Sequence, residues 1–279
     1  MNLMEKLMVE PGRKVDVREI DPSEDFGFGK KNLDHVVEEN SCRLREYQYK
    51  LYAENRQSLL LVFQAMDAGG KDGTINHVLY AMNPQGCRSH SFKVPTKEEA
   101  AHDFLWRYHK VAPAAGEVVI FNRSHYESVL VESVHNLISP KEVKKRYDRI
   151  NEFETVLRDN RTTVLKFFLH ISKEEQLKRF KDRLDDKSKQ WKISESDYTE
   201  RQFWDDYMKA FNGVLNHCST KHAPWFVIPA NNKDFRNFAV SEIVLDAMKK
   251  MDPAVPRPTV DPARIRKLYF SDTGGKKKK

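Results

Sequence analysis

Cysteine is scarce in this sequence, and long apolar runs are missing. The three cysteines, Cys42, Cys87 and Cys218, are odd in number and widely spaced, with no Cys-x-x-Cys pair. This argues against a disulfide framework and is typical of reduced thiols. No apolar run approaches the ~18 residues of a membrane-spanning helix, and acidic residues interrupt the short apolar run at the N-terminus. We therefore expect a cytoplasmic protein without a secretory signal or a membrane partner.

One sign of charge is in only slight excess. The 279 residues include 48 Lys and Arg against 41 Asp and Glu, a net charge of +7, and four of the lysines form the terminal run 276–279. Because the rest of the chain carries only 7 − 4 = +3, the overall charge is weak evidence for a polyanionic partner. We expect no nucleic acid partner on this ground, so local clusters of charge have to decide.

The chain is expected to divide into three parts. Residues 1–57 begin with an irregular arm, punctuated by proline and glycine, and continue into a helix over 31–55. Residues 58–252 would form one core. Residues 253–279 contain four prolines and the four terminal lysines, which predicts a tail rather than a second domain.

Short, continuous apolar runs separate longer amphipathic stretches in the core. Runs at 59–63, 118–121, 164–169 and 225–228, with a weaker one at 87–94, are typical of strands buried on both faces of a parallel sheet. Helical patterns lie between them, over 73–82, 97–109, 140–160, 173–184, 197–217 and 234–251. We predict an α/β fold, a three-layer sandwich in which helices flank a central parallel sheet.

A glycine-rich turn, AMDAGGKDG at 65–73, joins the first strand to the following helix. In such a turn, backbone N–H groups and the positive end of the helix surround a phosphate, and Lys71 would neutralise its outer oxygens. The strand–turn–helix context favours this interpretation over a plain turn whose glycines serve backbone geometry alone. The other residues of this phosphate loop are Ala68, Gly69, Gly70, Asp72 and Gly73.

Two residues of the loop depart from the general G-x-x-x-x-G-K-[ST] pattern. Ala65 stands at the first glycine, and Asp72 stands where a magnesium-binding Ser or Thr is expected. These departures argue against ordinary use of ATP. Asp67 lies inside the loop, where bound phosphates would repel its carboxylate unless a cation lay between them. Asp67 therefore predicts a Mg²⁺ ion, or Mn²⁺ in its place.

A second group of polar residues follows the strand at 118–121. Asn122, Arg123 and Glu127 would reach the carboxyl edge of the parallel sheet, where doubly wound folds bind ligands. Asn122 takes the place of a magnesium-directing Asp, Arg123 could clamp a transferring phosphoryl group, and Glu127 could supply the missing carboxylate and a second metal ligand. The alternative is a helix start capped by Ser124, with Arg123 in a surface ion pair.

The third candidate is a basic segment at 178–192, KRFKDRLDDKSKQWK, with seven basic and three acidic residues. A helix would place Arg179 and Arg183, four residues apart, on one face. Lys189 and Lys192 would follow in a flexible basic loop. The segment predicts a helical lid at about 178–196 that brings cations to the substrates. A charge run more often marks a solvated helix end, so this interpretation depends on the other two motifs.

The segments AMDAGGKDG, VIFNRSHYESVLV and RFKDRLDDKSKQWK, in this order, resemble the polyphosphate kinase type 2 family. The resemblance runs over about 52–251. It implies a P-loop kinase core similar to those of thymidylate and adenylate kinases, and a Mg²⁺-dependent exchange of phosphoryl groups between inorganic polyphosphate and nucleotides. AMP, ADP and ATP would be partners together with polyphosphate, and we expect a homo-oligomer.

The resemblance also implies roles for single residues. Asp67 and Lys71 would act in the phosphate loop and Arg123 at the second motif. Asn122, with Glu127 downstream, is similar to the class III branch, which accepts both AMP and ADP. The family's lid cations correspond to Arg179, Arg183, Lys189 and Lys192, and Lys187 stands where related lids often have Pro.

Two other functions stay open at this point. An ATP-dependent nucleoside monophosphate kinase would share the fold, but it is expected to keep Ser or Thr where Asp72 stands. A basic nucleic-acid-binding protein would use the tail and the lid, with a steep salt dependence.

Overall fold

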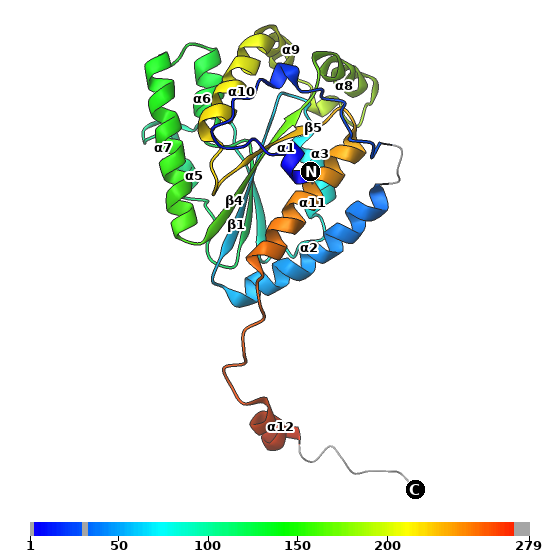
Figure 1. Ribbon diagram of the computed structural model, residues 1–279, viewed down its shortest axis with the longest axis vertical. Helices are drawn as coiled ribbons and strands as arrows, with labels where there is room; N and C mark the ends of the chain where they lie inside the picture. The colour runs from blue at the N-terminus through cyan, green and yellow to red at the C-terminus, as the bar shows by residue number, and fades with distance from the viewer. Residues whose placement is uncertain (1–2, 30–32, 271–279) are drawn as a thin grey trace.

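A five-stranded parallel sheet forms the centre of the protein (Figure 1). The computed structural model describes residues 3–29 and 33–270. The strands lie side by side in the order β2-β3-β1-β4-β5, and each neighbouring pair is parallel. Their bounds are β1 (Ser58–Ala65), β2 (Cys87–Ser91), β3 (Val118–Asn122), β4 (Thr162–His170) and β5 (Trp225–Pro229). All five predicted strands are confirmed, and β2 is shorter than its apolar pattern.

Helices cover both faces of the sheet, so the predicted three-layer α/β sandwich is confirmed (Figure 1). One layer contains α2 (Asp34–Glu54), α3 (Lys71–Leu79) and α11 (Lys233–Met251). The other contains α6 (Glu127–Val134), α7 (Pro140–Asp159) and α10 (Trp204–Cys218). Because both faces are covered, β1 is buried from Leu59 to Phe63, as its continuous apolar run indicates.

Two helical predictions are corrected, and one helix was missed. The pattern at 97–109 gives two short helices, α4 (Lys97–Ala100) and α5 (Trp106–His109), because the side chain of Asp103 accepts the backbone N–H of Leu105 and forms a turn between them. The pattern at 197–217 is divided by a 3₁₀ turn, η3 (Arg201–Phe203), between α9 (Glu195–Glu200) and α10. Helix α6 was not predicted: it spans only eight residues, too few for a clear helical period.

The two ends of the chain also differ from expectation. The arm predicted to be irregular contains α1 (Leu3–Leu7) and η1 (Val17–Glu19), and Met8 forms an antiparallel bridge with Phe226 of β5. Burial of Leu7, Val9 and Val17 holds the arm on the core.

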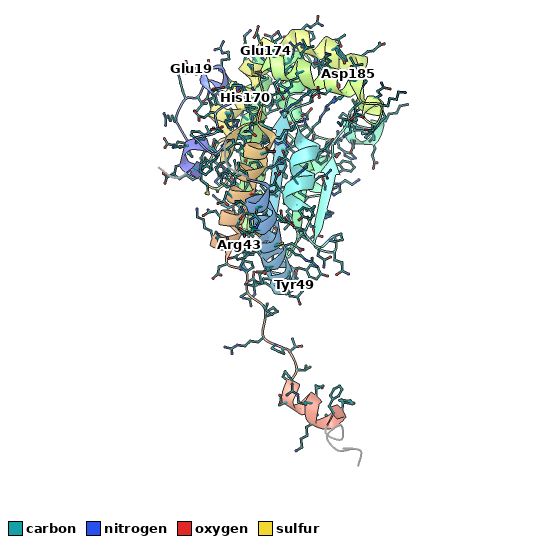
Figure 2. All side chains as sticks on the ribbon, turned by 90° about the vertical axis from the view of Figure 1, so that its right-hand side faces the viewer. Glu19, Arg43, Tyr49, His170, Glu174 and Asp185 are labelled. Atoms are coloured by element: carbon teal, nitrogen blue, oxygen red, sulfur yellow. The ribbon has the colours of Figure 1, made fainter. Side chains whose placement is uncertain are left out.

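The C-terminal tail leaves the core after α11. It contains an unpredicted helix, α12 (Pro262–Phe270), and all residues from 254 to 270 are exposed. In both views α12 lies beyond the end of α2, which Tyr49 marks in Figure 2. The terminal lysines 276–279 lie outside the described residues. No helix in the described segments is both long and apolar enough to cross a membrane.

Candidate phosphate-binding and catalytic site

The carboxyl end of β1 is where the strand order changes direction. β3 lies on one side of β1 and β4 on the other, so the loops that follow these strands diverge there. Open α/β sheets bind ligands at such a point. The loop from Met66 to Gly70 leaves β1 at this edge, and α3 begins at Lys71.

The glycines of the loop are required by its geometry. Gly70, the residue before α3, has φ +99°, and a Cβ on Gly69 would collide with the side chain of Ala65 and the carbonyl of Met66. Ala68 is also left-handed, with φ +59°. The turn therefore places backbone next to the N-terminus of α3, whose first N–H groups have no partner within the helix and can donate to an anion.

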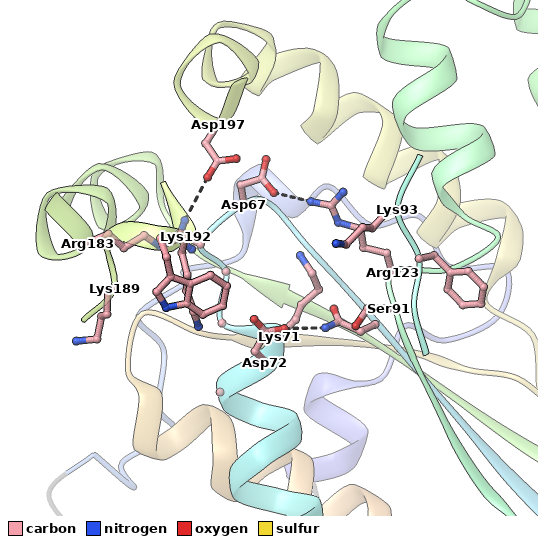
Figure 3. Close-up of a pocket in the computed structure, with 17 residues that line it drawn as sticks. Asp67, Lys71, Asp72, Ser91, Lys93, Arg123, Arg183, Lys189, Lys192 and Asp197 are labelled. Carbon is pink, nitrogen blue, oxygen red and sulfur yellow. Dashed lines mark hydrogen bonds and ion pairs between the residues drawn. The ribbon is translucent and has the colours of Figure 1, made fainter. Parts of the chain in front are cut away.

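The second motif meets the loop through two paired contacts (Figure 3). Arg123 donates from Nη2 to Oδ1 of Asp67 at 3.0 Å, and Asn122 donates from Nδ2 to Oδ1 of Asp72 at 2.7 Å. Arg123 itself is left-handed, with φ +62°, a conformation that costs roughly 1–3 kcal/mol. The structure thus brings together four of the predicted residues from two separate segments.

Lys71 and Glu127 lie close enough to these groups to change each other's ionisation. Burial, with the nearby Arg123, lowers the pKa of Lys71, whose Nζ donates to the carbonyl of Ala65 at 3.2 Å. Burial raises the pKa of Glu127, and Arg123 and Lys71 oppose that rise. Burial would lower the pKa of Arg123, but Glu127 and Asp67 outweigh it and raise the pKa. The site is thus a tightly coupled set of opposite charges.

A cavity of about 650 Å³, the loop cavity, opens above the phosphate loop (Figure 3). Positive side chains outnumber negative ones in its lining by six to three. The positive ones are Lys71, Lys93, Arg123, Arg183, Lys189 and Lys192, and the negative ones are Asp67, Asp72 and Asp197. An anion of several charges therefore suits this cavity better than a neutral ligand.

The segment predicted as a lid, about 178–196, contains the end of α8 (Lys173–Asp185), a 3₁₀ turn, η2 (Gln190–Lys192), and the start of α9. The turn is regular where a flexible loop was expected. Arg183 donates from Nη1 to Oδ2 of Asp197 at 3.2 Å, and Lys189 pairs with Asp186 at 2.6 Å. Arg183, Lys189 and Lys192 all line the loop cavity.

Arg179, predicted to share a face with Arg183, lies elsewhere. It is only 7% exposed and is not part of the cavity lining. Its guanidinium donates to the carbonyls of Ala68 at 3.0 Å and Ala230 at 2.6 Å, and to Glu175 at 2.8 Å. Arg179 thus links the phosphate loop to α8 by hydrogen bonds that lie outside the loop cavity.

A second, smaller cavity of about 270 Å³ adjoins the loop cavity and contains Glu127, so we call it the Glu127 cavity. The two cavities share Asp67, Arg123 and Asp197 in their linings. Apolar side chains contribute to the smaller one, namely Met66, Val94, Leu130, Val131 and Phe211. The paired Arg123 and Asp67 therefore lie between two spaces of different chemistry.

The sequence analysis did not single out several residues of the site. Lys93 lies two residues beyond β2, but the predicted strand ran to residue 94 and so placed Lys93 inside the strand instead of at its carboxyl end. Trp191 comes from the lid and is 78% exposed in the cavity lining, and Asp197 lies in α9 just beyond the lid. The partner of Arg183 could not be inferred, because Asp197 lies fourteen residues away in the sequence.

A buried ionic cluster supports the second motif from below. Lys166 of β4 and Glu154 of α7 are both fully buried and form an ion pair at 2.6 Å. Lys166 also donates to the hydroxyl of Tyr126 at 3.0 Å and to the carbonyl of Cys218 at 2.6 Å. Oε1 of Glu154 accepts from Tyr126 at 2.8 Å and lies 3.2 Å from Nε2 of His125. These bonds fix the backbone between Arg123 and Glu127.

The residues present fit a magnesium ion only if a substrate completes the site. Among residues 3–29 and 33–270, no three His, Cys, Asp or Glu side chains are arranged to hold a metal ion. Mg²⁺ is usually bound by one or two carboxylates, several waters and phosphate oxygens of the substrate. Asp67, at the border of the two cavities, meets that requirement once phosphates are bound.

The fold and site define a phosphotransferase of the P-loop kinase type. Its features are the glycine-rich loop at the strand-order switch, the turn beside it that carries Arg123, and the basic segment above the loop cavity. The chain belongs to the family described as "Polyphosphate kinase 2 (PPK2)", whose model matches residues 28–256. The family resemblance predicted from the three motifs is confirmed.

Known proteins similar to this chain agree with that assignment. A protein of Meiothermus ruber named "AMP/ADP-polyphosphate phosphotransferase" is 45% identical over 264 residues, which cover 94% of this chain and 99% of the relative. An "ADP-polyphosphate phosphotransferase" of Rhodopseudomonas palustris is 42% identical and covers 93% of this chain and 94% of the relative. The crystal structure of polyphosphate kinase 2 from Arthrobacter aurescens TC1 is 42% identical, covers 96% of each chain and has a TM-score of 0.92.

Proposed function

We propose that this protein transfers phosphoryl groups between inorganic polyphosphate and adenine nucleotides, converting AMP to ADP and ADP to ATP. The observation that carries the proposal is the position of Arg123 and Asp67 between two cavities. A phosphoryl group moving between two substrates has to pass such a point. The names of the relatives from Meiothermus ruber and Rhodopseudomonas palustris support polyphosphate as one substrate and AMP or ADP as the other.

Polyphosphate suits the loop cavity. Six cations line it, and three of them belong to the lid, on the side opposite Arg123 of the second motif (Figure 3). A linear polyanion needs such a track of cations along its length, whereas a single terminal phosphate would use only the loop. The phosphate loop, Lys71 and the lid would therefore hold the donor end of polyphosphate.

The nucleotide suits the Glu127 cavity. A nucleoside needs apolar contact for its base and polar groups for its sugar, which is the usual composition of a small-molecule site. The apolar side chains of this cavity lie beside Glu127, Glu200 and Arg201, and its shared Arg123 would meet the phosphate of the nucleotide.

Phosphoryl transfer requires alignment and neutralisation of charge more than covalent help from the protein. Lys71 and Arg123 would stabilise the charge on the transferred group, and Arg183 would add to it from the lid after leaving Asp197. Asn122 and Asp72 hold each other at the floor of the cavity and would keep the loop in register with the second motif.

A Mg²⁺ ion, or Mn²⁺ in its place, would be held by Asp67 together with phosphate oxygens, and Glu127 would be its second protein ligand. Such an ion supplies charge neutralisation between Asp67 and the phosphates. In the structure the carboxylate of Asp67 accepts a hydrogen bond from Arg123. Arg123 would give up this contact and bind the substrate when the metal ion binds Asp67.

The test is to incubate the purified chain with polyphosphate, AMP and Mg²⁺, without ATP, and to separate the nucleotides by chromatography. ADP should appear first and ATP after it. ADP without ATP would contradict the use of ADP. No product from AMP and polyphosphate, with ADP formed when ATP replaces polyphosphate, would indicate a nucleoside monophosphate kinase instead.

We also propose that the protein is a cytoplasmic homo-oligomer. Its cysteines at 42, 87 and 218 are free thiols, which suits the reducing cytoplasm.

The proposed self-association uses α12. One exposed face of this helix carries Ile265, Leu268 and Tyr269. A proline-rich arm, which is expected to be stiff, leads the helix away from its own core (Figure 1). A second copy would cover that face. Light scattering should give a multiple of 32.7 kDa, and Leu268→Glu should reduce it; a monomeric native chain would contradict the proposal.

A further inference from the structure

Arg236 is a buried cation directly behind the phosphate loop. It lies in the first turn of α11 and is only 3% exposed. A Cβ on Gly70 would collide with its Nη1, and a Cβ on Gly73 would come within 3.5 Å of its Nη2. The guanidinium is therefore separated from the phosphate side of the loop only by the backbone at the start of α3.

The charge of Arg236 is not balanced by a carboxylate. Its Nε and Nη2 donate to Oδ1 of Asn237, a neutral amide, at 3.2 and 2.9 Å, and within the described segments it forms no ion pair. Arg179, which approaches the same side of Gly70, has Glu175 as its partner. A buried charge normally has an opposite charge beside it, so Arg236 is the exception that needs a reason.

The surroundings of Arg236 make its charge more unfavourable. The N-termini of α3 and α11 both carry partial positive charge, and both lie at this residue. Burial, followed by the like charge of Arg179, lowers the pKa of Arg236 to about 10, and only Asp234 opposes the change. The guanidinium nevertheless remains protonated near neutral pH. An anion beside it would be stabilised by four positive groups, namely Arg236, Arg179 and the N-termini of α3 and α11.

We propose that Arg236 is a positioning residue for the anion held by the phosphate loop, and that a phosphate oxyanion is the missing counter-charge. The inference rests on the proposed use of the loop for polyphosphate. In the free protein the buried cation opposes folding, and a bound phosphate on the other side of Gly70 removes that opposition. An arginine with a purely structural role, joining α11 to the loop, would instead stabilise the free protein.

Thermal unfolding of the full chain, with and without inorganic tripolyphosphate, separates the two roles. Near-saturating tripolyphosphate should raise the Tm of the native chain by about 5–10 °C. Arg236→Met should have a Tm equal to or above that of the native chain without ligand, and should lose most of the rise with ligand. Arg236→Lys, which keeps the charge but not the planar group, should retain part of the rise.

Lys249→Met is the matched control, because it removes one positive charge from the exposed end of the same helix. It should leave both the Tm and the rise unchanged. An Arg236→Met chain that fails to fold, or that loses stability and keeps the full rise, would overturn the inference, as would a native chain whose Tm tripolyphosphate does not change. The readout is binding, so a native chain that binds tripolyphosphate but does not turn over contradicts the proposed function alone.

Discussion

Asn122 donates a hydrogen bond from Nδ2 to Oδ1 of Asp72 across 2.7 Å, which joins the end of β3 to the first turn of α3. Both residues are departures from the usual P-loop pattern: a carboxylate replaces Ser or Thr at 72, and an amide replaces a carboxylate at 122. The contact makes the two departures compatible in this chain. With Asp at both positions, two carboxylates would face each other at hydrogen-bond distance.

We expect Asn122→Asp to lower kcat/KM by about 10–100-fold, because the donated bond is replaced by repulsion at the floor of the loop cavity. Asp72→Asn in the same chain should restore most of the loss, since the two groups then exchange roles. Steady-state rates of ADP phosphorylation measure both variants. If the double variant were no faster than Asn122→Asp alone, the pair would not be coupled.

The pH dependence of turnover should reflect Glu127 and Lys71. Because burial raises the pKa of Glu127, its carboxylate is lost as pH falls through a value above the ordinary glutamate range. Because burial and Arg123 lower the pKa of Lys71, its charge is lost as pH rises through a value below the ordinary lysine range. kcat/KM should therefore fall on both sides of a narrowed maximum.

Glu127→Gln is the control for the acid side of that profile. The variant should be slower at neutral pH. Its remaining activity should stay constant as the pH falls through the range in which Glu127 of the native chain becomes protonated. An unchanged acid limb in this variant would assign the limb to another group.

Replacing Arg183 should affect polyphosphate more than nucleotide. Arg183→Ala removes a cation from the lid and frees Asp197, which leaves a negative charge in the loop cavity. We expect KM for polyphosphate to rise about tenfold, while KM for ADP changes little. Lys181→Ala, at an exposed position of the same helix outside the cavity lining, should change neither. An equal rise for both substrates would contradict the assignment of the loop cavity to polyphosphate.

The buried pair of Lys166 and Glu154 should dominate the stability of the second motif. Lys166→Met leaves Glu154 charged and fully buried without its partner, which should lower the free energy of unfolding by about 3–5 kcal/mol. Adding Glu154→Met removes the unpaired charge and should recover most of the loss. Urea unfolding of the two variants compares these values, and additive losses would mean that the residues are not coupled.

The sequence predicted the parts of the site that are local. The phosphate loop and the second motif each consist of a buried strand followed at once by polar residues, so their positions follow from the parallel sheet. It did not predict the contacts that depend on how distant segments meet. Arg236 lies within a helix whose other buried residues are mostly apolar. A reason for a cation at this position appears only in the structure, where α11 packs Arg236 against the phosphate loop.

The two lid arginines illustrate the same limit. Arg179 and Arg183 are four residues apart on α8, yet one is buried behind the loop and the other lines the cavity. Helical spacing places both on the side that faces the core. Arg179 donates to the loop carbonyl of Ala68, whereas Arg183, one turn later in α8, reaches the loop cavity, and this tertiary packing separates the two roles.

The most direct measurement is ATP formation from ADP and polyphosphate in the presence of Mg²⁺, with parallel reactions that lack polyphosphate, replace Mg²⁺ by a chelator, or use Lys71→Met. The account predicts ATP only in the complete reaction of the native chain, and a loss of several orders of magnitude in the variant. The reaction without polyphosphate excludes ATP made from two ADP molecules. ATP formed equally well without polyphosphate, or undiminished by Lys71→Met, would contradict the claim that the phosphate loop receives its phosphoryl group from polyphosphate.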